Sequence, residues 1–197
     1  MCQLKSGIIL KDRIYISESD SHTDMLKELG IEDSRGNAET LFVRAELIPP
    51  NGDVFADVET WCFNVDQDLR PDWFVEPYEK ERMVKAIKGW ADKHILIGRK
   101  NEEIGNGTYY LKDCIGVTLN NSTVKAWGNS TVKAWDNSTV KAWGNSTVKA
   151  YGNSTAIIPN RSSNNRDNIV LMQNSTLIDC KTKTIYQSGD WQFVKSK

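Results

Sequence analysis

The sequence contains little of what most catalytic and metal sites are built from. Only two histidines occur in 197 residues, which leaves almost no material for a histidine pair or a histidine-rich metal site. The four cysteines lie 60, 52 and 66 residues apart along the chain, which fits neither a zinc-knuckle spacing nor a small disulfide-stapled domain. We therefore expect reduced thiols, no bound metal and no cofactor.

Long hydrophobic runs are also missing. No segment approaches the roughly 18 apolar residues that a membrane span requires, and the first residues lack the apolar core of a signal peptide. At 39% hydrophobic and 26% charged, the composition is that of an ordinary globular protein. We therefore expect a cytoplasmic protein that does not associate with membranes.

Charge is unevenly distributed along a chain that is nearly neutral as a whole. Residues 1–120 carry 15 basic and 22 acidic side chains, a net charge of −7. Residues 121–155 carry four lysines and one aspartate, and residues 156–197 carry six basic and three acidic side chains, so each segment has a net charge of +3. An acidic front is thus joined to a basic rear, which indicates either two solvated surfaces or a rear surface for anionic partners.

A short repeat dominates the rear. Residues 121–152 are four near-identical octads, NSTVKAWG, NSTVKAWD, NSTVKAWG and NSTVKAYG, and further NST triplets begin at Asn153 and Asn174. Asn and Gly, together with β-branched Thr and Val, disfavour a helix. The stretch from Ser to Trp alternates with period 2, and a Gly-Asn or Asp-Asn pair separates one stretch from the next. Each octad therefore predicts one strand and one turn.

The cost of burial decides which face of the octads points inward. If Thr, Lys and Trp pointed inward, four lysines would be buried without acidic partners, at several kcal/mol each. We therefore expect Ser, Val and Ala to face inward, and Lys and Trp to face water. Two octads then form one coil of a two-sided β-solenoid, in which each coil advances by about 4.8 Å.

In such a solenoid, residues sixteen apart become neighbours and form ladders on the outer faces. The predicted ladder pairs are Trp127 with Trp143, Trp135 with Tyr151, Lys125 with Lys141, and Lys133 with Lys149. Repeated Lys beside repeated aromatic residues is typical of surfaces that bind polyanions or sugar polymers. The same ladders also hold a stack together. These eight residues are the candidate binding residues.

The chain as a whole predicts a mainly β protein with two domains. Residues 1–107 predict a small α+β domain, with helices at 22–29 and 77–92 and strands around 8–17, 41–47 and 60–65. Residues 108–197 predict the octapeptide-repeat solenoid with a C-terminal β cap, which includes strands around 169–172, 175–178, 184–186 and 191–194.

Cys2 raises an alternative hypothesis, because it directly follows Met1. If Met1 is removed, the thiol and the α-amine of Cys2 share one carbon, as in N-terminal-nucleophile hydrolases and in proteins that trap aldehydes. The sequence identifies no base or oxyanion partner for this thiol. A hydrolase or covalent trap that depends on Cys2 is therefore the competing class of function.

Two polar groups in the front domain have the residue types of metal or acid–base sites. The first is His22 with Asp20 and Asp24, and the second is Asp66 with Asp68 and Asp72. The first group is also what a capped helix start contains, and the spacing of the second is incomplete for a calcium loop. The sequence therefore predicts capping residues and a polar turn, and no metal site.

Several segments carry a family resemblance: MCQLKSG at residues 1–7, DSHTDML at 20–26, FVRAEL at 42–47 and FNVDQD at 63–68. They resemble an uncharacterised family from gut-bacterial phages and mobile elements, whose members carry NSTV-type octads behind a similar front. The resemblance implies a cytoplasmic accessory protein of a phage or its bacterial host, and implies no site residues.

The sequence as a whole favours a non-enzymatic binding or scaffold protein. In this hypothesis the front domain recognises a protein partner and the solenoid presents the Lys and Trp ladders. Binding of a polyanion or nucleic acid by the solenoid face is a further alternative. Exposed edges of the solenoid are candidate surfaces for pairing between copies of the chain.

Overall fold

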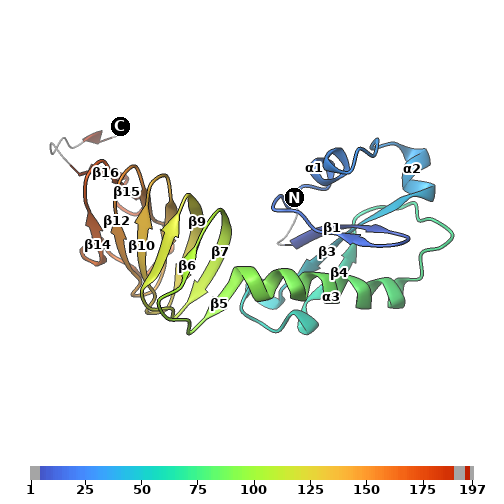
Figure 1. Ribbon diagram of the computed structural model, residues 1–197, viewed down its shortest axis with the longest axis horizontal. Helices are drawn as coiled ribbons and strands as arrows, with labels where there is room; N and C mark the ends of the chain where they lie inside the picture. Colours follow the sequence, from blue (N-terminus) through green and yellow to red (C-terminus); the bar gives the residue numbers. More distant parts are fainter. Residues whose placement is uncertain (1–4, 189–193, 196–197) are drawn as a thin grey trace. The chain divides into compact units, whose positions relative to one another are not determined.

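The structure is a computed structural model that describes residues 5–188, 194 and 195. The fold is mainly β, with a small N-terminal α+β region followed by a β-solenoid, as the sequence predicts. The chain divides into two compact units, residues 1–93 and 94–197, whose elements are labelled in Figure 1.

The N-terminal unit is built on a four-stranded antiparallel sheet with the order β2-β1-β3-β4. Its strands are β1 (Lys5–Leu10), β2 (Ile14–Tyr15), β3 (Phe42–Ile48) and β4 (Cys62–Val65). Successive side chains of a strand point to opposite faces of the sheet. One face buries Ile8, Leu10 and Phe42 against residues of the first two helices, namely Met25, Leu26 and Ala38.

Three α-helices accompany this sheet: α1 (His22–Glu28), α2 (Arg35–Thr40) and α3 (Glu76–His94). Ser21 caps α1 as predicted, because its Oγ accepts a hydrogen bond from the Asp24 backbone N–H at 3.2 Å. The short helix α2 is not evident from the apolar spacing. Two 3-10 turns, η1 (Pro50–Gly52) and η2 (Val58–Thr60), connect β3 to β4.

The long helix α3 buries Met83 and Ile87 completely. A Cβ added at Gly7 of β1 would lie 2.7 Å from the Met83 side chain, so Gly7 permits the close approach of α3 to the sheet. Charged residues recur along the helix. In the part of the chain that the structure describes, no helix has the length and apolarity needed to cross a membrane.

The second unit is the solenoid, which makes about four turns across residues 95–157. One sheet contains β5 (Ile95–Ile97), β7 (Gly107–Lys112), β9 (Ser122–Trp127), β11 (Thr139–Ala142), β13 (Thr155–Ile158), β15 (Thr176–Asp179), β16 (Thr184–Gln187) and β17 (Val194–Lys195). The other contains β6 (Glu103–Ile104), β8 (Val117–Asn120), β10 (Thr131–Trp135), β12 (Thr147–Ala150) and β14 (Ile169–Leu171). The chain alternates between the two sheets.

Parallel pairing within each sheet confirms two octads per coil. Val132 pairs with Val148, and Val140 pairs with Val124, each sixteen residues away. The solenoid begins at Ile95, ahead of the predicted boundary between residues 107 and 108, because β5 and β6 form a coil that pairs with β7 and β8, which in turn pair with the first octads. Hydrophobic residues without an octad pattern fill this coil, so the repeat does not reveal it.

The interior contains the residues predicted for it. The valines and alanines of the four octads are all 0% exposed. The inward serines are buried as well, and their hydroxyls bond to nearby carbonyls: Ser130 Oγ donates to Trp127 O, and Ser146 Oγ donates to Trp143 O, both at 2.7 Å. Because these polar groups are satisfied, small polar side chains alternate with apolar ones inside the solenoid at little cost.

The last residue of each octad adopts a left-handed conformation. The φ angles are 64° at Gly128, 58° at Asp136, 65° at Gly144 and 62° at Gly152. Glycine, and to a lesser degree aspartate, accepts this conformation. Gly144 is also constrained by space, since a Cβ there would lie 2.9 Å from the Gly128 carbonyl oxygen. These residues turn the chain from one sheet to the other.

The C-terminal end of the solenoid departs from the octad pattern. The loop after β13 contains the 3-10 turn η3 (Arg166–Asn168) and the buried Asn164, whose Nδ2 donates to Ser146 O at 2.8 Å. Strand β16 runs antiparallel to β15, as expected of a cap. The predicted strand at residues 191–194 and the hairpin before it lie largely outside the described residues.

Candidate binding surface of the solenoid

Stacked aromatic rings run along the outside of both sheets, as predicted. The ring centroids of Trp127 and Trp143 are 4.6 Å apart with planes 5° from parallel. Those of Trp135 and Tyr151 are 4.1 Å apart and 7° from parallel. Tyr110 extends the first ladder, since its centroid is 6.3 Å from that of Trp127.

This stacking occupies the faces of the rings. Trp127 has Tyr110 on one side and Trp143 on the other. A nucleic-acid base or a sugar ring needs a free aromatic face on which to stack. Trp127 therefore presents mainly its edges to solvent, whereas Trp143, Trp135 and Tyr151 each have one stacked ring partner. Their geometry favours a role in holding the coils together over a role as stacking platforms.

The lysine ladders also form, but the two ladders differ in their surroundings. Lys125 is in register with Lys141, and Lys133 with Lys149, so each pair lies on neighbouring strands. The ammonium group of Lys125 lies 4.7 Å from the centre of the Tyr110 ring and 3.4 Å from its hydroxyl. This contact holds part of the first ladder against the protein surface.

Lys133 and Lys149 are exposed, and neither has an acidic partner among the residues that the structure describes. Thr131 and Thr147 flank them on the same outer face. The second unit as a whole carries 13 basic and 7 acidic residues, a net charge of +6. We call Lys133, Lys149 and their flanking threonines the lysine face. It is a positively charged β surface.

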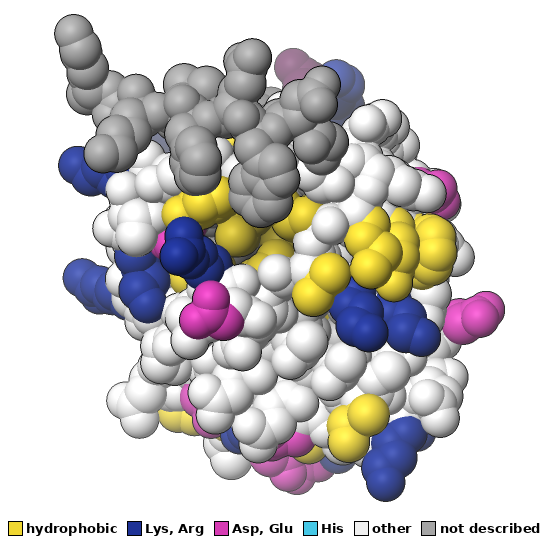
Figure 2. Space-filling view, turned by 90° about the vertical axis from the view of Figure 1, so that its left-hand side faces the viewer, with side chains coloured by type: hydrophobic (Ala, Val, Ile, Leu, Met, Phe, Trp, Pro, Cys, Tyr) yellow, Lys and Arg dark blue, Asp and Glu magenta, His cyan; other side chains and the backbone are white. Residues whose placement is uncertain are grey.

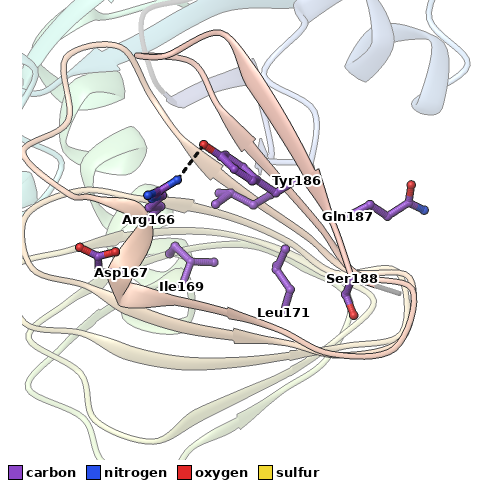
Figure 3. A pocket seen from close by; sticks show the side chains of 8 residues that line it. Arg166, Asp167, Ile169, Leu171, Tyr186, Gln187 and Ser188 are labelled. Carbon is purple, nitrogen blue, oxygen red and sulfur yellow. Dashed lines mark hydrogen bonds between the residues drawn. The ribbon is translucent and has the colours of Figure 1, made fainter. Parts of the chain in front are cut away.

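Among the described residues, the end of the solenoid after β14 carries a pocket. The pocket has a volume of about 690 Å³, and its lining includes Ile169, Leu171 and Tyr186. Figure 3 shows the first two side chains pointing toward the Tyr186 ring, while Arg166 donates a hydrogen bond to the Tyr186 hydroxyl at 3.3 Å. Hydrophobic side chains also gather at this end in the space-filling view (Figure 2). Pairing between copies through the edge of β14 remains a prediction.

The surroundings of Cys114 and His94 indicate structural roles for these two residues. Cys62 is exposed and Cys114 is buried, and burial raises the pKa of the Cys114 thiol, which keeps it protonated and unreactive. His94 bonds through Nδ1 to the Thr108 carbonyl at 2.9 Å and stacks on Tyr109. Cys2, the candidate nucleophile, lies outside the described residues.

In the front unit, the side chains of Asp20 and Asp24 do not form a polar group with His22. Asp20 pairs with the buried Lys5 at 2.8 Å, and the Asp24 carboxylate accepts a hydrogen bond from Ser19. His22 instead lies beside Asp66, with 3.3 Å between Nδ1 and Oδ2. Glu46 of β3 completes a group whose ligand atoms all lie within 4.8 Å of one another.

Sequence spacing does not reveal this group, because its members come from α1, from β3 and from the residue after β4. The antiparallel pairing of β3 with β4 and the packing of α1 against β3 bring them together. The comparisons with known proteins add no relative from which a site could be carried over: no protein-family model, no curated protein and no solved structure matches the chain.

Proposed function

We propose that this protein is a non-enzymatic binding protein whose lysine face binds an acidic partner protein. The observation that carries the proposal is the pair Lys133 and Lys149, which are adjacent in register, exposed and without acidic partners among the described residues. A cytoplasmic accessory role in a phage or its bacterial host, as the family resemblance implies, is part of the same proposal.

Electrostatics support an anionic ligand at this face. Neighbouring strands lie about 4.8 Å apart, and two unit charges at that separation repel by roughly 0.9 kcal/mol in water. A carboxylate placed between the two ammonium groups removes this repulsion and adds two attractive contacts. The repeat thus keeps a like-charge pair that is unfavourable in the free protein and favourable in a complex.

The aromatic ladders favour an acidic protein over a nucleic acid. Because Trp135 and Tyr151 already stack on each other, one face of each ring is occupied. A single strand of nucleic acid would gain charge contacts but less base stacking, which otherwise contributes about 1–3 kcal/mol per base. A β surface with exposed lysines, threonine hydroxyls and aromatic rings suits a protein surface that carries carboxylates.

The test is binding of poly-L-glutamate to the full-length chain and to a Lys133→Gln/Lys149→Gln variant. At about 0.2–1 kcal/mol for each exposed contact, the double variant should bind about 2- to 30-fold more weakly. The matched control is Lys125→Gln/Lys141→Gln on the opposite face, which should lose less. Equal losses in the two variants, or none in either, would show that the lysine face is not the binding surface.

Two further measurements sharpen the result. The Lys133→Gln/Lys149→Gln variant should be at least as stable to urea as the wild type, because the substitution removes a repulsion. An oligothymidylate of equal charge should bind no more tightly than poly-L-glutamate. Much tighter binding of the oligonucleotide would support the nucleic-acid alternative instead.

A further inference from the structure

The N-terminal unit brings together the side chains of His22, Glu46 and Asp66, whose polar atoms are incompletely paired. His22 donates its Nε2 hydrogen to the Ala45 carbonyl at 3.1 Å, which leaves the lone pair of Nδ1 on a neutral ring pointing away. That nitrogen faces the Asp66 carboxylate at 3.3 Å. Both atoms present lone pairs, so a positive species has to lie between them.

Glu46 makes a metal ion a better candidate than a proton. Its side chain is only 5% exposed, and it has no hydrogen-bond or ion-pair partner within the described ranges 5–188 and 194–195. The Glu46 oxygens are not among the fully buried atoms that lack a partner, so they keep some contact with solvent. A carboxylate that is largely removed from water is still more favourable when it is paired with a positive group. One proton between His22 and Asp66 leaves Glu46 unsatisfied, whereas a divalent cation balances both carboxylates at once.

Ser6 supplies a second, independent observation. It is 0% exposed, and its hydroxyl lacks a hydrogen-bond partner among the described residues. Ser6 on β1 is paired directly with Glu46 on β3, so the two side chains project from the same face of the sheet. A water molecule bound to a metal at this place would satisfy the Ser6 hydroxyl.

We propose that His22, Glu46 and Asp66 bind a divalent transition-metal ion, with Zn²⁺ as the best fit and water as a fourth ligand. Zinc binds imidazole nitrogen and carboxylate oxygen at about 2.0–2.1 Å with tetrahedral geometry, which places neighbouring ligand atoms about 3.3 Å apart. The His22–Asp66 distance already has this value. The Glu46 ligand atom lies within 4.8 Å of the other two, so it has to move closer to them when the ion binds.

The surroundings match those of an open zinc site. The hydrogen bond from His22 to a backbone carbonyl is the usual way in which a protein orients a metal-binding imidazole. Asp66 is 57% exposed and lines a pocket of about 310 Å³, so the group is reachable from solvent on the Asp66 side. Magnesium and calcium prefer sites made only of oxygen ligands, and should bind more weakly here.

The test is titration of Zn²⁺ into the full-length, EDTA-treated protein, with a chromophoric chelator as competitor. We expect one equivalent to bind, and Glu46→Gln and Asp66→Asn each to weaken binding by more than about 100-fold, since even a second-shell change costs about 10–100-fold. Ser6→Ala should weaken it by about 10-fold. The matched controls are Asp68→Asn and Cys62→Ser, which should bind as the wild type does.

Thermal unfolding separates metal binding from a folding defect. In EDTA, Glu46→Gln and Ser6→Ala should unfold at or above the wild-type temperature, because the first removes a negative charge beside Asp66 and the second removes a buried hydroxyl without a partner. In excess Zn²⁺ the order should reverse, because only the wild type gains full stabilisation from the ligand. Absence of tight Zn²⁺ binding by the wild type, or equal binding by Asp66→Asn, whose exposed position makes a folding failure improbable, would overturn the proposal.

Discussion

Deletion of a whole octad should be tolerated better than deletion of one residue inside an octad. Removing residues 129–136 joins Gly128 to Asn137, which has the same local sequence as the native junction of Gly128 with Asn129. Val140 then takes the place of Val132 opposite Val117, and the following octad again pairs with β9. All later coils keep their mutual pairing and shift together by half a turn.

The expected magnitudes differ several-fold. At about 0.05–0.15 kcal/mol per residue, loss of eight residues lowers the free energy of unfolding by about 0.4–1.2 kcal/mol. Deletion of Val132 alone reverses the alternation along β10 and turns Lys133 toward the interior. The lost burial of Val132, which is 0% exposed, costs roughly 1.5–3 kcal/mol, and the buried lysine costs several kcal/mol more.

Urea unfolding followed by far-UV circular dichroism measures both effects. The octad deletion should give a cooperative transition with a midpoint near that of the wild type, whereas the Val132 deletion should unfold at a much lower urea concentration or not fold. If the two deletions are equally damaging, the octad is not the structural unit and the account of the solenoid is incorrect.

The remaining predictions concern single positions in the solenoid. Val140→Asp should lower the free energy of unfolding by several kcal/mol because it buries a charge, whereas Lys141→Asp next to it should change it by less than about 1 kcal/mol; urea titration of both variants decides this. Gly144→Ala should destabilise by at least about 1 kcal/mol, because φ is 65° and the new Cβ meets backbone, while Asp136→Gly at the equivalent turn should be nearly neutral; a stable Gly144→Ala would contradict the turn geometry. Burial raises the pKa of the Cys114 thiol in the folded state above its ordinary value of 9.0. The contribution of the protonated thiol to stability is therefore complete below about pH 9 and is lost as the pH rises through the folded-state pKa. Cys114→Ala should reduce this loss of stability at alkaline pH in unfolding experiments, and an unchanged pH profile would show that Cys114 does not cause the loss.

The solenoid could be predicted because the same octad, with the same alternation of residue types, occurs four times in succession. Lysine is too costly to bury without partners, so a single physical argument fixes the inward face, and sixteen-residue periodicity then fixes the ladders. The place of Tyr110 in the first aromatic ladder was not predicted, because Tyr110 is in register with Lys125, which is only fifteen residues away. The fifteen-residue spacing from β7 to β9 breaks the sixteen-residue count on which the prediction of the ladders depends.

The front unit could be predicted only in part, because its important contacts are nonlocal. Local signals were sufficient for α1, with its Ser21 cap, and for α3. They could not place Glu46 beside His22, since that proximity depends on the packing of a helix on a sheet and on the register of β3 with β4. Asp20 and Asp24, the aspartates nearest to His22 in sequence, instead interact with Lys5 and Ser19.

The most direct test of the central claim is to identify which lysines contact an acidic partner. Zero-length carbodiimide cross-linking of poly-L-glutamate to the full-length protein, followed by peptide mass spectrometry, reports lysines that touch carboxylates. The account predicts cross-links concentrated at Lys133 and Lys149, with fewer at Lys125 and Lys141. Cross-links spread evenly over all exposed lysines, or concentrated in residues 1–93, would contradict it.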